Sequence, residues 1–355
     1  MNRILVLGAG KIGIAVAQML YDSGDYRVTI ADSAAVPEDR RTGRDLDRVR
    51  LDVTDKGALR TCLQGHDGVV SALPYFLNVG VAEVARSADV HYFDPTEDVR
   101  TARKIREIAQ GAKTVFVPQC GLAPGFIAIV ANHLVDRFDL PDDIRLRVGA
   151  LPQYPDNALK YNLTWSTDGL INEYCNPCEV IHEGERRDTV PLEGLEHFTL
   201  DGNQYEAFAT SGGVGSLCET LAGRVRNLSY KTIRYPGHRD MIKMLADDLK
   251  MCSRRAVFKD IIEQGIPVTQ QDVVVIFVTV RGIKEGRYVQ ESYVKQIYAG
   301  QNGSPWNAIQ LTTASSICAV VDLCTTGQIP ATGFVKQEQI GFTAFIANRF
   351  GRVYA

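Results

Sequence analysis

The sequence predicts an α/β protein, in which a Rossmann-type doubly wound parallel sheet is followed by a second α+β domain on a mostly antiparallel sheet. Two observations predict the first part. An apolar strand at residues 3–7 runs directly into a glycine-rich turn and a helix, and strands and helices then alternate as far as residue 117. A third observation predicts the second part, because longer segments after residue 143 alternate apolar and polar residues around hairpin turns.

The glycine-rich turn has the GxGxxG spacing of a dinucleotide-binding loop. Its first glycine permits a tight turn, its second lets the backbone approach a pyrophosphate, and its third lets the helix pack closely on the strand. The phosphates would then lie at a helix N-terminus, where free N–H groups and the helix dipole favour negative charge. The predicted nucleotide contacts in this turn are Gly8, Gly10, Lys11, Ile12 and Gly13.

An acidic residue ends the second predicted strand, at residues 27–32. Asp32 follows the last glycine at the ~20-residue spacing of a carboxylate that binds the ribose hydroxyls, and it would repel a 2′-phosphate. Residues 33–35 offer no cation for such a phosphate, although Arg40, Arg41 or Arg44 could fold back. The sequence therefore favours NAD over NADP as the cofactor.

The remaining strands of the first domain are predicted at residues 49–53, 68–73, 90–94 and 114–117, with helices at 56–63, 78–87 and 98–109. Ligands of such sheets bind beyond the carboxyl ends of the strands. Asp52, Val53, Ala72, Leu73 and Pro74 lie at those ends and are predicted to contact the nucleotide. Asp94 and Cys120 lie at two further strand ends and are expected near the nicotinamide.

The second domain is predicted from strands at residues 144–148, 159–165, 272–280 and 288–298, and from hairpins at 179–190 and 198–209. Helices are expected at 214–226, 238–251, 255–264, 309–323 and 337–349. We place the domain boundaries at 1–121 for nucleotide binding and 122–308 for substrate. Residues 309–355 are predicted to return to the first domain.

Composition argues against several classes of protein. A 355-residue chain with 45% hydrophobic residues and a formal net charge of −3 is typical of ordinary soluble globular proteins and gives no reason to expect nucleic acid or a membrane as partner. We expect no signal peptide, because the first Rossmann strand starts at residue 3, and hence a cytoplasmic protein with reduced thiols. Cys175 and Cys178 have CxxC spacing, but a second ligand pair is missing, so no metal site is predicted.

Four motifs make the sequence resemble the saccharopine dehydrogenase/reductase-like family, and within it the lysine 6-dehydrogenase type most closely. They are residues 119–126 (QCGLAPGF), 149–152 (GALP), 161–166 (YNLTWS) and 234–238 (RYPGH). The resemblance implies NAD-dependent oxidation of the ε-amine of L-lysine to 2-aminoadipate 6-semialdehyde with release of ammonia. It leaves saccharopine or carboxynorspermidine as alternative substrates, and a non-catalytic NAD-binding sensor as another class. We also expect a homo-oligomer.

Candidate substrate and catalytic residues follow from this chemistry. Arg234 offers a planar fork for the substrate carboxylate, as the matching arginine does in the reductase relatives, or it pairs with a structural acid. His238 and Asp94 are candidates for proton transfer, with a helix cap and a loop cap as their structural alternatives. Cys120 is expected to line the pocket. Further candidate substrate contacts are Tyr161, Lys160 and Glu219, of which Tyr161 also fits a packing role and Glu219 a helix-dipole role.

Overall fold

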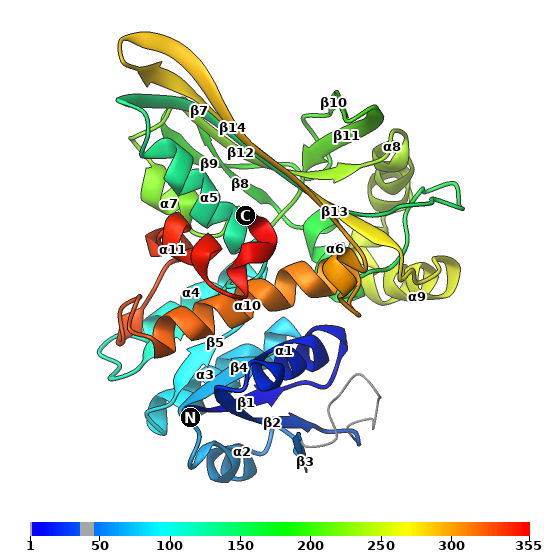
Figure 1. The fold of residues 1–355 in the computed structure, drawn as a ribbon. Coiled ribbons are helices and arrows are strands. Elements are labelled where there is room, and N and C mark those ends of the chain that lie inside the picture. Colours follow the sequence, from blue (N-terminus) through cyan, green and yellow to red (C-terminus); the bar gives the residue numbers. More distant parts are fainter. Residues whose placement is uncertain (1, 36–45) are drawn as a thin grey trace. The chain divides into compact units, whose positions relative to one another are not determined.

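The computed structural model describes residues 2–35 and 46–355 (Figure 1). The chain divides into two compact units, residues 1–126 together with 310–355, and residues 127–309. The C-terminal segment thus belongs to the same unit as the glycine-rich turn.

Unit 1 is built on a seven-stranded parallel sheet in the order β15-β6-β5-β4-β1-β2-β3. The order reverses between β1 and β4, which is the switch point at which Rossmann sheets bind nucleotides. The strands are β1 (Asn2–Leu7), β2 (Tyr26–Asp32), β3 (Asp47–Arg50), β4 (Gly68–Ser71), β5 (His91–Phe93), β6 (Val115–Val117) and β15 (Gly333–Phe334). The Rossmann-like parallel sheet predicted from the sequence is confirmed.

Helices cover both faces of this sheet, so its central strands β1 and β4 are largely buried on both sides, whereas the edge strand β3 is mostly exposed. Leu5 and Leu7 of β1 pack in one core cluster with residues of α2, α3 and α4. The other face carries α1 and α10, which lie side by side in Figure 1 and are joined where Cys318 donates to Val16 O. The helices are α1 (Lys11–Asp22), α2 (Lys56–Leu63), α3 (Tyr75–Ser87), α4 (Val99–Ile108), α10 (Ala308–Thr325) and α11 (Phe342–Ala347).

Helix α10 is long and apolar enough to cross a membrane by length and composition, but 83% of it is buried inside the protein. Its burial is that of a core helix. The Tyr26 hydroxyl of β2 donates to Asp322 near its C-terminal end, at 2.7 Å. This contact ties the C-terminal segment to the first strands of the same unit.

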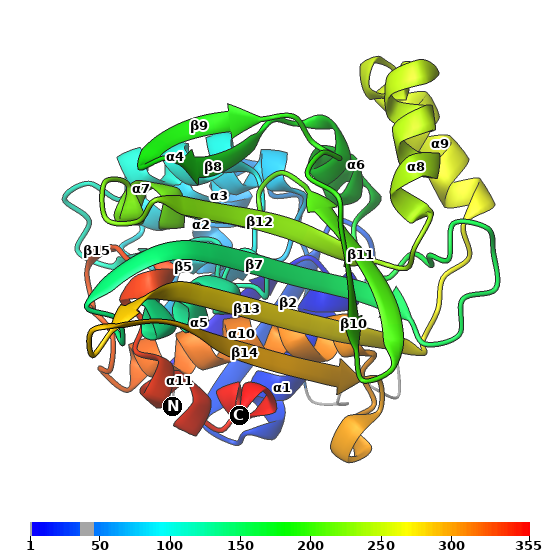
Figure 2. The ribbon, with the colours of Figure 1, turned by 90° about the horizontal axis from the view of Figure 1, so that it is seen from above.

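Unit 2 contains an eight-stranded mixed sheet whose main path is β10-β11-β12-β7-β13-β14, with β8 and β9 joined to β12 (Figure 2). All pairs are antiparallel except β12 with β7. The strands are β7 (Leu140–Pro152), β8 (Cys178–His182), β9 (Glu185–Thr189), β10 (Glu196–Leu200), β11 (Asn203–Ala209), β12 (Asn227–Arg234), β13 (Asp272–Lys284) and β14 (Arg287–Tyr298). The two predicted hairpins and the long β13–β14 pair are confirmed.

The helices of unit 2 are α5 (Phe126–Val135), α6 (Thr167–Cys175), α7 (Leu217–Leu221), α8 (His238–Lys243) and α9 (Arg255–Gly265). A short π-helix (Met244–Asp248) continues α8, and a 3₁₀ turn (Met251–Ser253) precedes α9. Residues of α6, α8 and α9 share one core cluster with Tyr161 and Phe208. In this helical lobe, α8 and α9 lie beyond one end of the sheet in Figure 2.

Several predicted elements differ from the structure, among them the helix expected at 214–226, of which only α7 is helical. The strand expected at 159–165 is wrong, because residues 161–164 are all buried and only Leu163 makes an isolated bridge, to Val268. The third Rossmann strand ends at Arg50, since Asp52 closes a turn by accepting from the Thr54 N–H and hydroxyl. The helix expected at 337–349 is interrupted at Gly341 into a 3₁₀ turn and α11.

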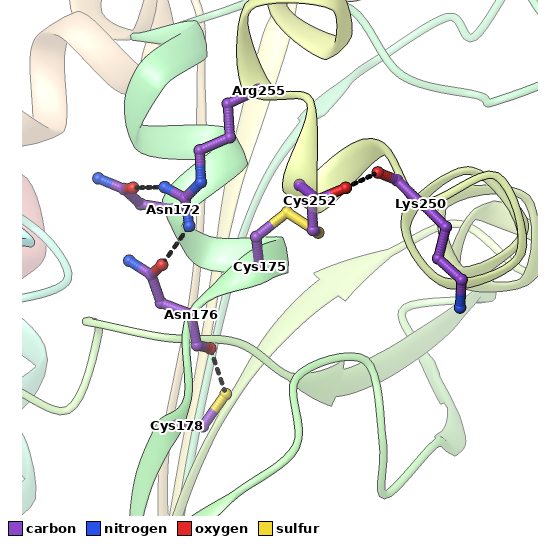
Figure 3. Close-up of a disulfide and its surroundings, with 8 residues drawn as sticks. Asn172, Cys175, Asn176, Cys178, Lys250, Cys252 and Arg255 are labelled. Carbon is purple, nitrogen blue, oxygen red and sulfur yellow. Dashed lines mark hydrogen bonds between the residues drawn. A yellow bond between two sulfur atoms is a disulfide. The ribbon is translucent and has the colours of Figure 1, made fainter.

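A disulfide joins Cys175, at the end of α6, to Cys252 in the 3₁₀ turn before α9 (Figure 3). The expectation of reduced thiols throughout is therefore wrong for these two residues. The CxxC partner, Cys178, is instead a buried thiol that donates to Asn176 O. Arg255 supports the same junction by donating to the side chains of Asn172 and Asn176.

Candidate functional site

The glycine-rich turn needs two of its glycines for steric reasons and one for access. Gly8 has a φ of +96°, and a Cβ there would lie 2.8 Å from Ala72 O. A Cβ on Gly13 would lie 1.8 Å from Gly8 O, so only glycine permits this close packing of α1 on β1. Gly10 has no atom within 4 Å of the Cβ position. The turn therefore leaves open space at Gly10, where the backbone of a GxGxxG loop approaches the pyrophosphate.

The N-terminus of α1 begins at this open position. Gly10 is its N-cap without a side chain, and Lys11 is exposed while Ile12 is half-buried. The first N–H groups of a helix have no intrahelical partner, and the helix dipole favours an anion there. The residues present fit the pyrophosphate of a dinucleotide.

Asp32 lies at the end of β2, beside this turn. Its Oδ2 accepts from the Ala9 N–H at 2.7 Å, and its Oδ1 accepts from the Ala34 N–H at 2.9 Å. Oδ1 also accepts from the Ser33 hydroxyl at 3.5 Å, so the carboxylate is fixed mainly by backbone donors and Oδ2 keeps a lone pair for a further donor. Such a carboxylate fits a pair of ribose hydroxyls.

Arg50 reaches the same place from the neighbouring strand and was not predicted. It pairs with Asp32 in the β2–β3 register, and its Nε donates to Ser33 O at 3.1 Å. From the sequence, only residues 33–35 and the arginines after them were considered as cations for a 2′-phosphate. Arg50 was overlooked because the third strand was expected to continue to residue 53. Arg40, Arg41 and Arg44 lie outside the described residues.

Of the other predicted nucleotide contacts, some lie at the glycine-rich turn and others lie elsewhere in unit 1. Ala72 and Leu73 lie directly against Gly8, so they border the turn. Pro74 is the N-cap residue of α3. Asp52 instead accepts both Thr54 donors, which lower its pKa, while Val53 packs against the core cluster of unit 1.

Asp94 and Cys120 meet at the ends of β5 and β6, where both are fully buried. Asp94 Oδ1 accepts from the Thr96 N–H at 2.7 Å, and the Asp94 carbonyl accepts from both the N–H and the thiol of Cys120. Burial raises the pKa of Asp94 to about 6, against the opposing effects of the Tyr92 hydroxyl and the Thr96 and Gln119 N–H groups. Burial also raises the pKa of Cys120, so its thiol stays neutral. These contacts hold two strand-end loops together.

A second group of buried polar residues lies in unit 2 around Arg234, the last residue of β12, and is called the Arg234 cluster below. Arg234 is its cation, with 2% of its surface exposed. Its Nε donates to the Tyr174 hydroxyl at 3.2 Å and its Nη1 to Ile233 O at 2.9 Å, while Nη2 lies 3.9 Å from Glu173. The guanidinium carbon lies 4.8 Å from the centre of the Tyr161 ring. The arginine is held in place while part of its donor fork remains for a carboxylate.

His238 lies in the same cluster and completes a directed chain of hydrogen bonds. Its Nδ1 lies 2.8 Å from Leu159 O, a pure acceptor, so Nδ1 carries the proton. Nε2 then accepts from the Tyr174 hydroxyl at 3.0 Å. Burial, with the nearby Arg234 charge, lowers the pKa of His238 to about 3, so the ring stays neutral. These contacts position Tyr174 and, through it, Arg234.

The other predicted substrate contacts lie at different places. Tyr161 is buried beside Arg234, as described, whereas Lys160 is exposed with a φ of +50° and donates to Pro236 O at 3.1 Å. Glu219 is exposed on α7, where its charge acts on Arg186 of β9. Figure 2 shows α7 and α8 near opposite ends of β12, so the structure does not bring Glu219 to the Arg234 cluster.

Two family models match successive parts of the chain. Residues 4–117 match the family model "Saccharopine dehydrogenase NADP binding domain", and residues 121–351 match "Saccharopine dehydrogenase C-terminal domain". The chain is similar to saccharopine dehydrogenase [NADP(+), L-glutamate-forming] of Saccharomyces cerevisiae, with 25% identity over 69% of this chain and 58% of that protein. It is also similar to the mitochondrial alpha-aminoadipic semialdehyde synthase of Rattus norvegicus, with 22% identity over 64% of this chain and 27% of that protein.

The fold has a close counterpart among solved structures. The apo, histidine-tagged saccharopine dehydrogenase (L-Glu forming) of Saccharomyces cerevisiae superposes with a TM-score of 0.77, at 16% identity, over 97% of this chain and 95% of that one. The curated relatives are longer, and the chain spans 27% to 58% of their length in the two examples given.

Proposed function

Since the chain belongs to the saccharopine dehydrogenase family, we propose that it is a nicotinamide-nucleotide-dependent dehydrogenase acting on a carbon–nitrogen bond of an amino acid. The reaction we assign to it is the NAD-dependent oxidative deamination of the ε-amine of L-lysine. In this reaction the ε-carbon gives a hydride to NAD⁺, the nitrogen loses a proton, and water converts the imine to 2-aminoadipate 6-semialdehyde and ammonium.

The observation that carries the proposal is the buried Arg234. A substrate with an α-carboxylate needs a cation whose geometry matches it, and a guanidinium binds a carboxylate through two parallel hydrogen bonds. Burial strengthens such a pair because water does not compete. Arg234 donates Nε to Tyr174 and Nη1 to Ile233 O, so the remaining N–H groups of its two terminal nitrogens are the donors left for a carboxylate.

The number of buried arginines favours lysine over saccharopine, which carries three carboxylates. Among the described residues of unit 2, the buried arginines are Arg147 and Arg234. Arg147 is paired with the carboxylate of Glu196 and lies over the Phe277 ring. Arg234 also has an acid near it, but its Nη2 lies 3.9 Å from Glu173, which is longer than a hydrogen bond, so Arg234 is the buried arginine left for a substrate with one carboxylate.

The cofactor, when bound, accepts the hydride, and the chain's own residues hold it. Gly8, Gly10 and Gly13 shape the phosphate-binding turn, and Asp32 would accept hydrogen bonds from the adenosine ribose. This carboxylate supports NAD as the preferred nucleotide. The family model describes an NADP-binding domain, which supports the opposite preference.

The second candidate is saccharopine dehydrogenase activity, favoured by the family match and by the curated relatives. Both reactions oxidise the same lysine-derived carbon, and they differ in the nitrogen product, which is ammonium from lysine and glutamate from saccharopine.

The test incubates the protein with lysine labelled with ¹⁵N at the ε position, or with saccharopine, and with NAD⁺ or NADP⁺. We expect NADH and labelled ammonium in equal amounts from lysine. NADH without labelled ammonium would assign oxidation to the α-carbon. Oxidation of saccharopine but not of lysine would support the second candidate, saccharopine dehydrogenase activity. Nucleotide binding without any turnover would identify a sensor.

A further inference from the structure

Two oppositely charged residues lie side by side where the adenosine ribose of a Rossmann-bound nucleotide is read. Asp32 ends β2, Arg50 ends β3, and the two are partners in the parallel register. The side chain of Arg50 crosses to β2, where its Nε donates to Ser33 O at 3.1 Å. A guanidinium therefore occupies the position next to the acid although the residue after the acid is a serine.

The carboxylate and the guanidinium are held independently of each other. Asp32 is bound to the N–H groups of Ala9 and Ala34, whereas Arg50 is bound to a carbonyl. No salt bridge joins the two side chains among the described contacts. Each charge can therefore act on a ligand without first breaking a pair with the other.

The donors of Arg50 suit a phosphate. Its side chain is exposed, and its two terminal nitrogens donate to no residue in the described part of the chain. The planar fork of a guanidinium binds phosphate oxygens in pairs, and an arginine close to the ribose-binding acid is the usual way in which a Rossmann site accommodates a 2′-phosphate.

We propose that Arg50 binds the 2′-phosphate of NADP, so that the nucleotide preference of this chain is set by Asp32 and Arg50 acting in opposition. Asp32 accepts from the free ribose hydroxyls of NAD and repels the phosphate of NADP, while Arg50 offsets that repulsion. The proposal deepens the proposed function and rests on it only in that unit 1 binds a nicotinamide nucleotide.

The proposal accounts for two features that point in different directions. An acid at the end of β2 is typical of NAD sites, but the family model that matches this unit describes an NADP-binding domain. If β3 supplies a cation, one site can combine an acid for the ribose of NAD with a donor for the 2′-phosphate of NADP. We therefore expect the chain to bind both nucleotides.

The experiment measures the binding of 5′-AMP and 2′,5′-ADP to the full chain by isothermal titration calorimetry. These ligands differ only in the 2′-phosphate, so neither catalysis nor a substrate is involved. We expect Arg50→Gln to weaken 2′,5′-ADP at least tenfold and 5′-AMP less than twofold. Asp32→Asn, whose single oxygen can serve one of the two backbone donors, should shift the preference toward 2′,5′-ADP.

A matched control is Arg27→Gln at the start of β2, because Arg27 is also exposed and pairs with Asp47 at the same edge of the sheet. It lies five residues, roughly 16 Å, from Asp32 along the strand, and should leave the ratio of the two affinities unchanged. Arg50→Lys, which keeps the charge but loses the fork, should fall between wild type and Arg50→Gln.

Two outcomes would overturn the proposal. An unchanged ratio in Arg50→Gln would mean that another cation reads the phosphate. An equal loss for both ligands would assign Arg50 to the adenine or to the loop. Failure of the proposed function gives a different pattern, in which both ligands bind as expected while neither lysine nor saccharopine is oxidised.

Discussion

The Tyr174 hydroxyl lies 3.0 Å from His238 Nε2 and accepts from Arg234 Nε at 3.2 Å. Because His238 donates through Nδ1 to a carbonyl, the hydroxyl proton points to Nε2 and its oxygen lone pairs face Arg234. A neutral histidine thus fixes the direction in which a buried tyrosine accepts from the arginine. Burial keeps this arrangement in one protonation state, since it lowers the pKa of His238 and raises that of Tyr174.

Tyr174→Phe should therefore disturb Arg234 without touching the nucleotide unit. The change leaves His238 Nε2 and Arg234 Nε without this partner, and buried polar groups left unsatisfied cost about 1–3 kcal/mol each. We expect a lower free energy of unfolding and a several-fold higher KM for the amino acid. Denaturant titration and steady-state kinetics measure the two effects.

The control is Tyr235→Phe, because the Tyr235 hydroxyl donates to Pro152 O and not to the Arg234 cluster. It should lose stability without a change of KM. A similar KM in both variants would show that the tyrosine does not position the arginine.

Arg234→Lys should weaken the binding of the amino acid and spare that of the nucleotide. Lysine keeps the charge but has one donor group in place of a fork, and truncating one partner of a buried charge pair costs about 2–5 kcal/mol. Calorimetric titration with the amino acid and with NADH separates the two sites. Normal amino-acid binding, or an equal loss of nucleotide binding, would contradict the assignment.

Gly10→Ala and Gly13→Ala form a matched pair in the phosphate-binding turn. Gly13→Ala would place its methyl group 1.8 Å from Gly8 O, so we expect a large loss of stability. Gly10 has a negative φ of −77° and open space around its Cβ position, so Gly10→Ala should fold normally. Its methyl group would nevertheless occupy the approach of the pyrophosphate, and NADH binding should fall at least tenfold. Thermal unfolding and NADH fluorescence measure the two effects. Unchanged NADH affinity in Gly10→Ala would contradict the position of the phosphates.

The sequence predicts the Rossmann unit well because its signals are local. Gly8, Gly13 and Asp32 lie within 25 residues of each other in one strand–turn–helix–strand unit, and that unit has the predicted form. Arg50 was missed because a short turn at Asp52 ended its strand early, and strand ends depend on single side-chain hydrogen bonds.

The Arg234 cluster was predicted only in part, because it is assembled by tertiary packing. Tyr174 is 60 residues from Arg234 in the chain, and no spacing rule connects them. Residues 159–165 alternate like a strand, but the segment from 161 to 164 is buried on both sides and pairs only at Leu163. The resemblance to a family identified Arg234 and Tyr161 as candidate substrate contacts. The structure adds Tyr174 and His238, whose hydrogen bonds position Arg234.

Asp94→Asn should make stability less dependent on pH. The folded-state pKa of Asp94 is about 6, above its usual value of 3.8, so the folded chain holds more protons than the unfolded chain between these values. Stability is then lost as the pH rises from about 4 to 7, by up to about 3 kcal/mol for a shift of this size.

Asparagine removes this charge and keeps an oxygen for the Thr96 N–H. The free energy of unfolding of the variant, relative to wild type, should therefore rise across this pH range, as measured by denaturant titration at pH 4, 5.5 and 7. A constant difference between the two proteins would mean that Asp94 is ionised throughout.

The Cys175–Cys252 disulfide should stabilise unit 2 and, through α6, its arginine cluster. The bond closes a loop between residues 77 apart, for which the chain-entropy model gives a stabilisation of about 4.5 kcal/mol. Cys175 follows Tyr174 directly in α6, and Cys252 lies in the lobe that also contains His238. Loosening this junction (Figure 3) should therefore disturb the tyrosine that holds Arg234.

We expect the double variant Cys175→Ser and Cys252→Ser to unfold at a lower denaturant concentration and to bind the amino acid more weakly. NADH affinity should stay unchanged, because its predicted contacts belong to unit 1. Cys178→Ser is the control, since its thiol is buried next to the junction but forms no disulfide. A dithiol reductant should reproduce the effect in wild type and leave the double variant unaffected. If reductant changes both proteins equally, or changes neither, the disulfide does not support the site.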